Sequence, residues 1–245
     1  MYDKKLYPTI LNFINIVFMK QINCDLGECL IPDPDGVIMP LIDMANIACG
    51  GHVGDEESMT IAIKLAKQNG VQIGAHPSYP DKDNFGRISH SISSDELFQH
   101  IFEQVVYFQS LCKQQGVELQ YIKPHGALYH DMMNDAEVLD VLCNVIHNVE
   151  STLSLVVHAG INTELFESVS KDSGIQFFYE AFADRAYRGF QMIPRGEQGA
   201  VLDDVQAIVD QYHYFSTDRS NHIDIICFHS DNPSSTLALT MLKAK

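Results

Sequence analysis

Acidic, imidazole and basic side chains recur where short apolar segments of this chain end. They are Asp25, Glu28, His52, His76, Lys123, His125, His158, Glu180, Asp184, Arg185, His229 and Asp231. Carboxylates and imidazoles transfer protons and bind divalent metals, whereas Lys and Arg bind anions. Ionisable groups gathered in one pocket are costly unless they are paired, bound to metal or used, so the whole set indicates a site more strongly than any single member.

Two loops in this set carry further signals. The stretch NIACGGHVGD, residues 46–55, places His52 and Asp55 among glycines. Glycine suits a loop that approaches a ligand, but the same pattern also fits a strand-to-helix turn in which Asp55 is the N-cap, and both interpretations stay open here. The stretch HPSYPDKDNFGR, residues 76–87, is expected to fold as a lid because Tyr79 and Phe85 need burial.

The apolar segments have the length of strands, and amphipathic segments with helical periodicity lie between them. We expect strands at residues 21–26, 45–50, 71–76, 119–125, 153–159, 175–182 and 222–229, and the clearest helices at residues 55–70 and 93–116. This alternation predicts an α/β fold with parallel strands and right-handed crossovers, and a closed barrel is preferred to an open, doubly wound sheet. In a barrel the carboxyl ends of the strands meet on one face, so the set above would converge.

The length and the lack of a linker favour one barrel domain over residues 19–245. Residues 1–18 are expected to be an N-terminal extension, either added or the result of an upstream start, because Met19 opens a stretch that reads as a fresh beginning. The apolar part of this extension, residues 8–18, is too short to cross a bilayer and lacks a cleavage pattern, which disfavours export.

Composition restricts the partners. The formal net charge of -16 disfavours binding to nucleic acid or to an anionic membrane, so we expect small molecules or proteins as partners. The six cysteines are scattered and form no C-x-x-C pair, which indicates reduced thiols and a cytoplasmic location. No glycine-rich dinucleotide or P-loop motif follows any expected strand.

The motifs INCDLGE, ANIACGGHVGD, VQIGAHPSYPDKDNFGR, YIKPHGALY, FADRAY and ICFHSDNP, in this order, resemble the LamB/YcsF family from Met19 to the C-terminus. The resemblance implies a (β/α)7-type barrel related to those of glycoside hydrolases and polysaccharide deacetylases. It also implies ATP-dependent opening of the lactam 5-oxoproline to glutamate, carried out together with subunits B and C. The motifs depart from the family pattern at Cys29, Gly51 and Ser230, where we expect effects on substrate range and turnover rather than on the fold.

The chemistry of lactam opening assigns roles to the strand-end residues. We hypothesise that Asp25 holds and deprotonates water, with the like charge of Glu28 shaping its pKa. The predicted catalytic set is Asp25, His52, His76, Lys123 and His125, of which His52, His76 and His125 are also candidate ligands of a divalent metal. The predicted set that binds substrate or phosphate is Asn23, Glu28, Asn46, Arg87, Asp184, Arg185 and His229. In the competing structural interpretation, Asp184 and Arg185 form only a rim ion pair.

Three functions remain open. ATP is expected as a co-substrate held with the partner subunits, because no nucleotide motif is visible in this chain. One alternative is a stand-alone metal-dependent amidohydrolase or deacetylase, which would use Asp25 and the histidines as ligands. The other is a non-catalytic subunit that binds an acidic metabolite.

Overall fold

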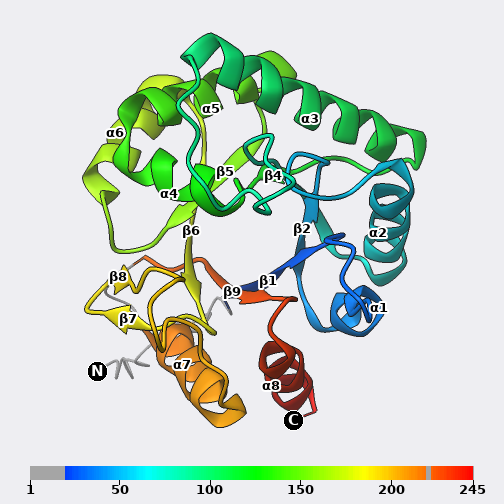
Figure 1. Cartoon of the computed structure of the whole chain (residues 1–245), viewed down its shortest axis with the longest axis vertical. Coiled ribbons are helices and arrows are strands. Elements are labelled where there is room, and N and C mark those ends of the chain that lie inside the picture. Colours follow the sequence, from blue (N-terminus) through cyan, green and yellow to red (C-terminus); the bar gives the residue numbers. More distant parts are fainter. Residues whose placement is uncertain (1–19, 219–221, 245) are drawn as a thin grey trace, which may run out of the picture.

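The computed structural model describes residues 20–218 and 222–244, so the expected extension at residues 1–18 lies outside the described residues. Within them the parallel strands close into a barrel in the order β1-β2-β3-β4-β5-β6-β9 (Figure 1). Their bounds are Gln21–Leu26, Met44–Ala48, Gln72–His76, Tyr121–Ile122, Ser154–His158, Phe177–Phe182 and Ile225–His229. The prediction of a (β/α)7-type barrel is therefore confirmed, although β4 has only two residues.

Helices surround the barrel, as Figure 1 shows. They are α1 (Asp35–Ile38), α2 (Glu56–Asn69), α3 (Ser94–Gln114), α4 (Gly126–Asn134), α5 (Ala136–Val149), α6 (Thr163–Ser173), α7 (Val205–Thr217) and α8 (Pro233–Lys243), with a 3-10 turn at Met39–Leu41. A small antiparallel hairpin, β7 (Tyr187–Arg188) with β8 (Gln191–Met192), lies between β6 and α7. We did not predict this hairpin, because two-residue strands leave no periodicity in the sequence. None of the helices in the described ranges has the length and hydropathy to cross a bilayer.

The N-cap interpretation of Asp55 is confirmed. Its side chain accepts a hydrogen bond from the Ser58 amide, and the Ser58 hydroxyl lies 2.9 Å from the Asp55 amide, which completes a capping box at the start of α2. Asp55 is exposed, whereas His52, three residues earlier, is 1% exposed. The glycine-rich loop therefore serves both purposes, since it starts a helix and carries a buried histidine.

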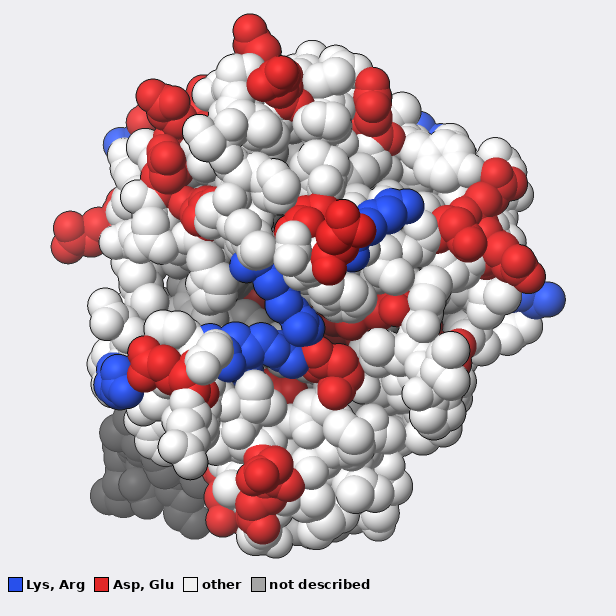
Figure 2. Space-filling model, in the orientation of Figure 1, with Lys and Arg blue, Asp and Glu red and all other residues white. Residues whose placement is uncertain are grey.

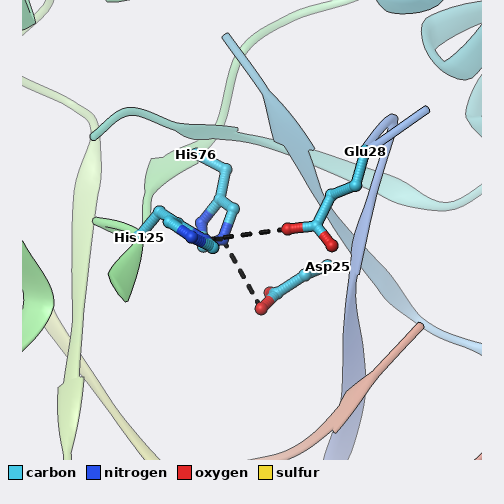
Figure 3. A group of neighbouring side chains, drawn as sticks. All are labelled: Asp25, Glu28, His76 and His125. Carbon is cyan, nitrogen blue, oxygen red and sulfur yellow. Dashed lines mark hydrogen bonds and ion pairs between the residues drawn. The ribbon is translucent and has the colours of Figure 1, made fainter. Parts of the chain in front are cut away.

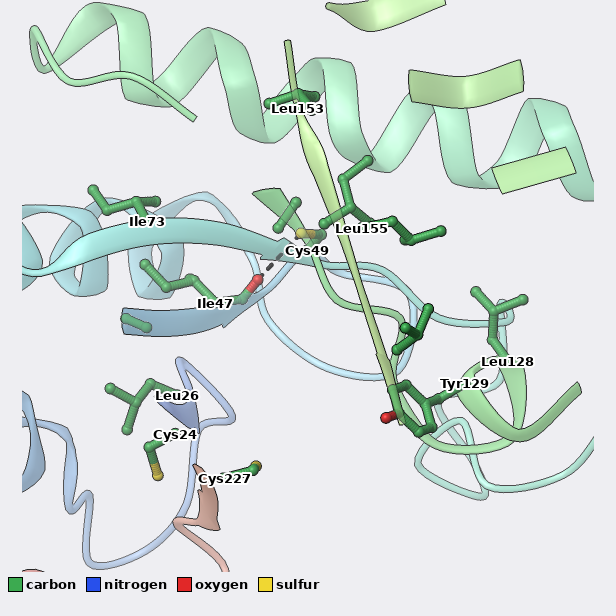
Figure 4. Packing of buried hydrophobic residues seen from close by; sticks show 14 of the residues in the cluster. Cys24, Leu26, Ile47, Cys49, Ile73, Leu128, Tyr129, Leu153, Leu155 and Cys227 are labelled. Carbon is green, nitrogen blue, oxygen red and sulfur yellow. Dashed lines mark hydrogen bonds between the residues drawn. The ribbon is translucent and has the colours of Figure 1, made fainter. Parts of the chain in front are cut away.

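Alternate strand residues pack on opposite faces of the barrel wall. Those on the outer face, including the four labelled in Figure 4 as Leu26, Ile47, Ile73 and Leu155, join the apolar core that packs against the helices. The side chains that alternate with these face the barrel interior. There Met44, Tyr121, Val156 and Ile225 form a separate apolar cluster. This cluster is a floor below the polar side chains that the strands carry toward their carboxyl ends.

Gly74 of β3 makes room for this floor. A methyl group at Gly74 would overlap ring atoms of Tyr121, whose buried hydroxyl donates to Asn46 Oδ1 at 2.8 Å. We expect Gly74→Ala to lower the free energy of unfolding by about 1–3 kcal/mol through overpacking, as measured by urea unfolding. The control is Gly36→Ala in α1, where the new methyl group has no neighbour within 4 Å. Equal losses in the two variants would contradict this account.

Candidate active site

A cavity of about 690 Å³ opens at the carboxyl ends of the barrel strands. Eight of the predicted site residues line it: Asp25, Glu28, His76, Arg87, Lys123, His125, Arg185 and His229. Four others are absent from its lining and lie behind it or beside it: Asn23, Asn46, His52 and Asp184. The structure therefore brings together the strand ends that the barrel prediction required to meet.

Asp25 is fixed on the floor of this cavity by two donors. Its Oδ1 accepts from Asn46 Nδ2 at 2.7 Å and from Lys123 Nζ at 2.8 Å. Its Oδ2 lies 3.5 Å from His76 Nε2 and 3.8 Å from His229 Nε2. Burial alone would raise the pKa of Asp25, but the charges of His76 and Lys123 outweigh burial and hold this pKa well below its usual range. Asp25 is therefore an ionised anchor.

Glu28 has the opposite electrostatic character. Burial, followed by the negative charge of Asp25, raises the pKa of Glu28 to about 7. Its Oε1 lies 3.5 Å from His52 Nε2 and 3.6 Å from His125 Nδ1. The like-charge effect expected between the two carboxylates thus acts on Glu28 and not on Asp25, so Glu28 is the carboxylate whose proton affinity suits proton transfer near neutral pH.

The rings of His76 and His125 face each other with unprotonated nitrogens (Figure 3). His76 Nδ1 donates to the Lys123 carbonyl at 2.6 Å, and His125 Nε2 donates to the Phe85 carbonyl at 3.0 Å. The two remaining nitrogens, His76 Nε2 and His125 Nδ1, are 2.9 Å apart. In neutral rings both carry lone pairs, and this arrangement is unfavourable unless a cation lies near them. Burial, followed by the neighbouring His52, holds the pKa of His125 well below its usual range, which disfavours a proton as that cation.

A divalent metal fits this geometry better. Asp25, Glu28, His76 and His125 each offer one ligand atom, and these atoms lie within 4.8 Å of one another. Such a set of oxygen and imidazole ligands suits Zn²⁺ and similar first-row ions. A second set, Asp25 with Cys227 and His229, is less suitable because burial raises the pKa of the Cys227 thiol far above its usual range.

His52 lies outside both of these groups of ligand atoms. Its ring stacks on His125 with centroids 3.7 Å apart and an interplanar angle of 2°. Phe85 packs edge-on against both rings, at centroid distances of 5.1 and 5.5 Å. Phe85 and the buried Tyr79 show that residues 76–87 form a folded loop, as expected. Of the three predicted metal ligands, the structure therefore groups His76 and His125, and it places His52 where it supports the ring of His125.

Lys123 holds the interior carboxylates. Its Nζ contacts Asp25 Oδ1 at 2.8 Å, Glu180 Oε2 at 3.4 Å and Cys227 Sγ at 3.1 Å. Asn23 Nδ2 also donates to Glu180 Oε2, at 3.1 Å. Burial would lower the pKa of Lys123, but the neighbouring Asp25 outweighs burial and raises this pKa well above its usual range. Lys123 therefore stays cationic, and Asn23 and Asn46 position the carboxylates from behind the cavity.

Asp184 orients His229. Its carboxylate accepts from His229 Nδ1 at 2.8 Å, from the His229 amide at 3.0 Å and from the Ser235 hydroxyl at 2.7 Å. Burial would lower the pKa of His229, but Asp184 outweighs burial and raises it. Arg185 instead donates to the carbonyls of Ile193 and Ala200. Asp184 and Arg185 thus form no ion pair with each other in the part of the chain that the structure describes, which contradicts the rim ion-pair interpretation.

Arginines line the mouth of the cavity. They are Arg87, Arg185 and Arg195, and Figure 2 shows basic side chains crossing the hollow in this face. Arg87 and Arg195 both donate to Asp231 Oδ2, at 2.8 and 2.5 Å. The sequence placed Asp231 at a strand end but gave it no role, and it did not identify Arg195. Arg195 lies in a loop without periodicity, so no local signal separated it from a surface arginine.

Comparisons with known proteins agree along almost the whole chain. The LamB/YcsF family profile matches residues 20–245. A Vibrio cholerae protein named as the A subunit of 5-oxoprolinase is 36% identical over 238 residues, which cover 91% of this chain and 96% of that protein. A Pseudomonas aeruginosa protein, named as the third A subunit of 5-oxoprolinase in that organism, is 36% identical over 237 residues, which cover 91% and 94%.

Experimental structures share the fold. The lactam utilization protein from Thermus thermophilus has a TM-score of 0.80 and 29% identity, covering 92% of this chain and 97% of that one. A GH113 β-1,4-mannanase has a TM-score of 0.55 and 12% identity, covering 93% of this chain and 98% of that one. The mannanase shows a shared barrel and nothing about activity.

Proposed function

This chain belongs to the LamB/YcsF family, and from that premise we propose that it opens the lactam ring of 5-oxoproline to give glutamate, as one component of an ATP-dependent hydrolase. The observation that carries the proposal is the composition of the cavity. Two carboxylates and two facing histidines lie at its floor, and three arginines lie at its mouth. This is the set of groups needed to activate water beside a bound anion.

Water activation is assigned to Asp25 and Glu28. Lys123 and Asn46 bind Asp25 Oδ1 and leave Oδ2 facing the histidines, so this oxygen is positioned to orient a water molecule. Glu28 contacts only histidine nitrogens at Oε1, which leaves it free to accept the proton. A divalent metal held by Asp25, Glu28, His76 and His125 would make bound water more acidic and would polarise the lactam carbonyl.

The leaving nitrogen needs a proton, and His229 is placed to supply it. Asp184 holds its Nδ1, which directs Nε2 toward Asp25 and the cavity. Asp184 also stabilises the cationic form of the ring, so that His229 can act as an acid. The arginines at the mouth would bind the carboxylate of the substrate, because guanidinium groups suit bidentate contact with a carboxylate.

ATP is assigned to the partners. The chain carries no nucleotide-binding motif, and the names of the relatives describe one component of a larger enzyme, which supports assembly with subunits B and C. We therefore place ATP binding on those subunits and ring opening on this one. The six cysteines are all free, which supports the cytoplasmic location expected from the sequence.

The test is release of glutamate from 5-oxoproline by this chain alone and with its candidate B and C subunits, each with and without ATP. We expect release only when both subunits and ATP are present. Amide hydrolysis by the chain alone without ATP would instead favour a metal-dependent amidohydrolase, which is the second candidate because the four-residue ligand set fits that chemistry too. Ligand binding without turnover in any combination would favour a non-catalytic subunit.

A further inference from the structure

Two arginines at the mouth of the cavity share one carboxylate oxygen. Arg87 lies between β3 and α3, and Arg195 lies between β8 and α7, yet both donate to Asp231 Oδ2. The other oxygen, Asp231 Oδ1, is buried and has no hydrogen-bond partner among the described residues. One carboxylate therefore satisfies two guanidinium groups incompletely and is itself incompletely satisfied.

The neighbouring Arg185 is held differently. It is 4% exposed, and its donors bind the carbonyls of Ile193 and Ala200. The side chains of Arg87 and Arg195 are 41% and 29% exposed, and the hydrogen bonds given for their guanidinium groups go to Asp231. Arg185 is thus a fixed charge, whereas Arg87 and Arg195 are free to exchange one carboxylate for another.

The charges at the mouth favour such an exchange. Three arginines line the cavity there, and Asp231 is the carboxylate that two of them bind. This leaves an excess of positive charge in a chain whose formal net charge is -16. A second carboxylate at the mouth would be attracted by the unmatched guanidinium charge and would restore the missing hydrogen bonds.

We propose that Arg87 and Arg195 form an anion subsite that Asp231 occupies in the free protein, and that a substrate carboxylate displaces Asp231. Arg195 and Asp231 then determine selectivity for lactams that carry a carboxylate over neutral lactams of the same ring size. A neutral lactam offers no anion to exchange and leaves the pair of arginines closed on Asp231. The identity of the lactam rests on the proposed function, whereas the anion subsite rests on the geometry alone.

The test is calorimetric binding of L-5-oxoproline and of 2-pyrrolidinone, the same ring without the carboxylate, to the full chain without ATP or partner subunits. We expect Arg195→Gln to weaken binding of 5-oxoproline by about tenfold to a hundredfold and to leave that of 2-pyrrolidinone within about twofold. Asp231→Asn removes the competing carboxylate and is expected to strengthen 5-oxoproline binding by about threefold to tenfold.

The matched control is Arg188→Gln, in β7 of the same region, because Arg188 pairs with Glu197 in solvent and does not line the cavity. It should bind both lactams as the wild type does. Thermal unfolding checks each variant, and Arg195→Lys keeps the charge if Arg195→Gln fails to fold. Equal weakening of both lactams in Arg195→Gln, no preference for the carboxylate in the wild type, or weaker binding in Asp231→Asn would each overturn the proposal.

The same measurements separate this proposal from the proposed function. If the complete complex does not open 5-oxoproline but the wild type still prefers the carboxylate and Arg195→Gln loses that preference, the function is wrong and the subsite stands. If the complex is active and Arg195→Gln keeps the preference, the subsite is wrong and the function stands.

Discussion

Replacing Asp25 with Asn is expected to lower kcat for ring opening in the complete complex by about 10²- to 10⁴-fold, the range attributed to a positioned proton-transfer group. The change removes the charge that Lys123 and His76 face and replaces an acceptor of two hydrogen bonds with an amide. The fold should persist, because Lys123 keeps Glu180 Oε2 at 3.4 Å as a second anionic partner.

The control for this variant is Asp210→Asn. Asp210 is exposed on α7, where it accepts from Gln206 on the same helix. Initial rates of glutamate release, with circular dichroism to check folding, compare the two variants. A folded Asp25→Asn protein with the rate of the wild type would remove Asp25 from the catalytic assignment.

A divalent metal is expected to stabilise the protein strongly. At a concentration of about 100 times its Kd, a bound ion adds about 2.7 kcal/mol to the free energy of unfolding. For a domain of this size, that corresponds to a rise in Tm of roughly 5–11 °C. The physical reason is the pair of facing nitrogens of His76 and His125, 2.9 Å apart, beside two buried carboxylates. Calorimetry of chelator-treated protein with added Zn²⁺ or Mn²⁺ measures the shift.

His125→Ala should abolish this rise in Tm, because it removes one of the facing nitrogens. His100→Ala is the matched control, since His100 is exposed on α3 and outside the ligand set, and it should respond as the wild type does. A wild-type Tm that ignores both ions would argue against a metal. The two rings would then have to share a proton, at the cost of burying a cation.

The sequence predicted the barrel because both of its signals are local. Strand length and helical periodicity are visible within each segment, and the closed topology then brings together strand ends such as those of Asp25, His76 and Lys123. Asp55 was equally readable, since an N-cap depends only on the residues that follow it.

Roles that depend on distances between segments were not readable. The raised pKa of Glu28 comes from its burial and from Asp25 at closer range than sequence spacing reveals. His52 shares its residue type with the candidate ligands, and only the stacking on His125 distinguishes it. Arg195 acquires its place at the mouth through its contact with Asp231, which is 36 residues away in the chain.

The apolar floor made by Met44, Tyr121, Val156 and Ile225 gives the barrel the character of a blind well. An ion crossing this floor would lose its hydration among apolar side chains, so the amino-terminal side of the barrel is closed to charged molecules. Anionic substrate and dianionic product must then use the same arginine-lined entrance. Any partner that hands over a short-lived intermediate must therefore dock on that face, and it must withdraw or leave a gap before the product can depart.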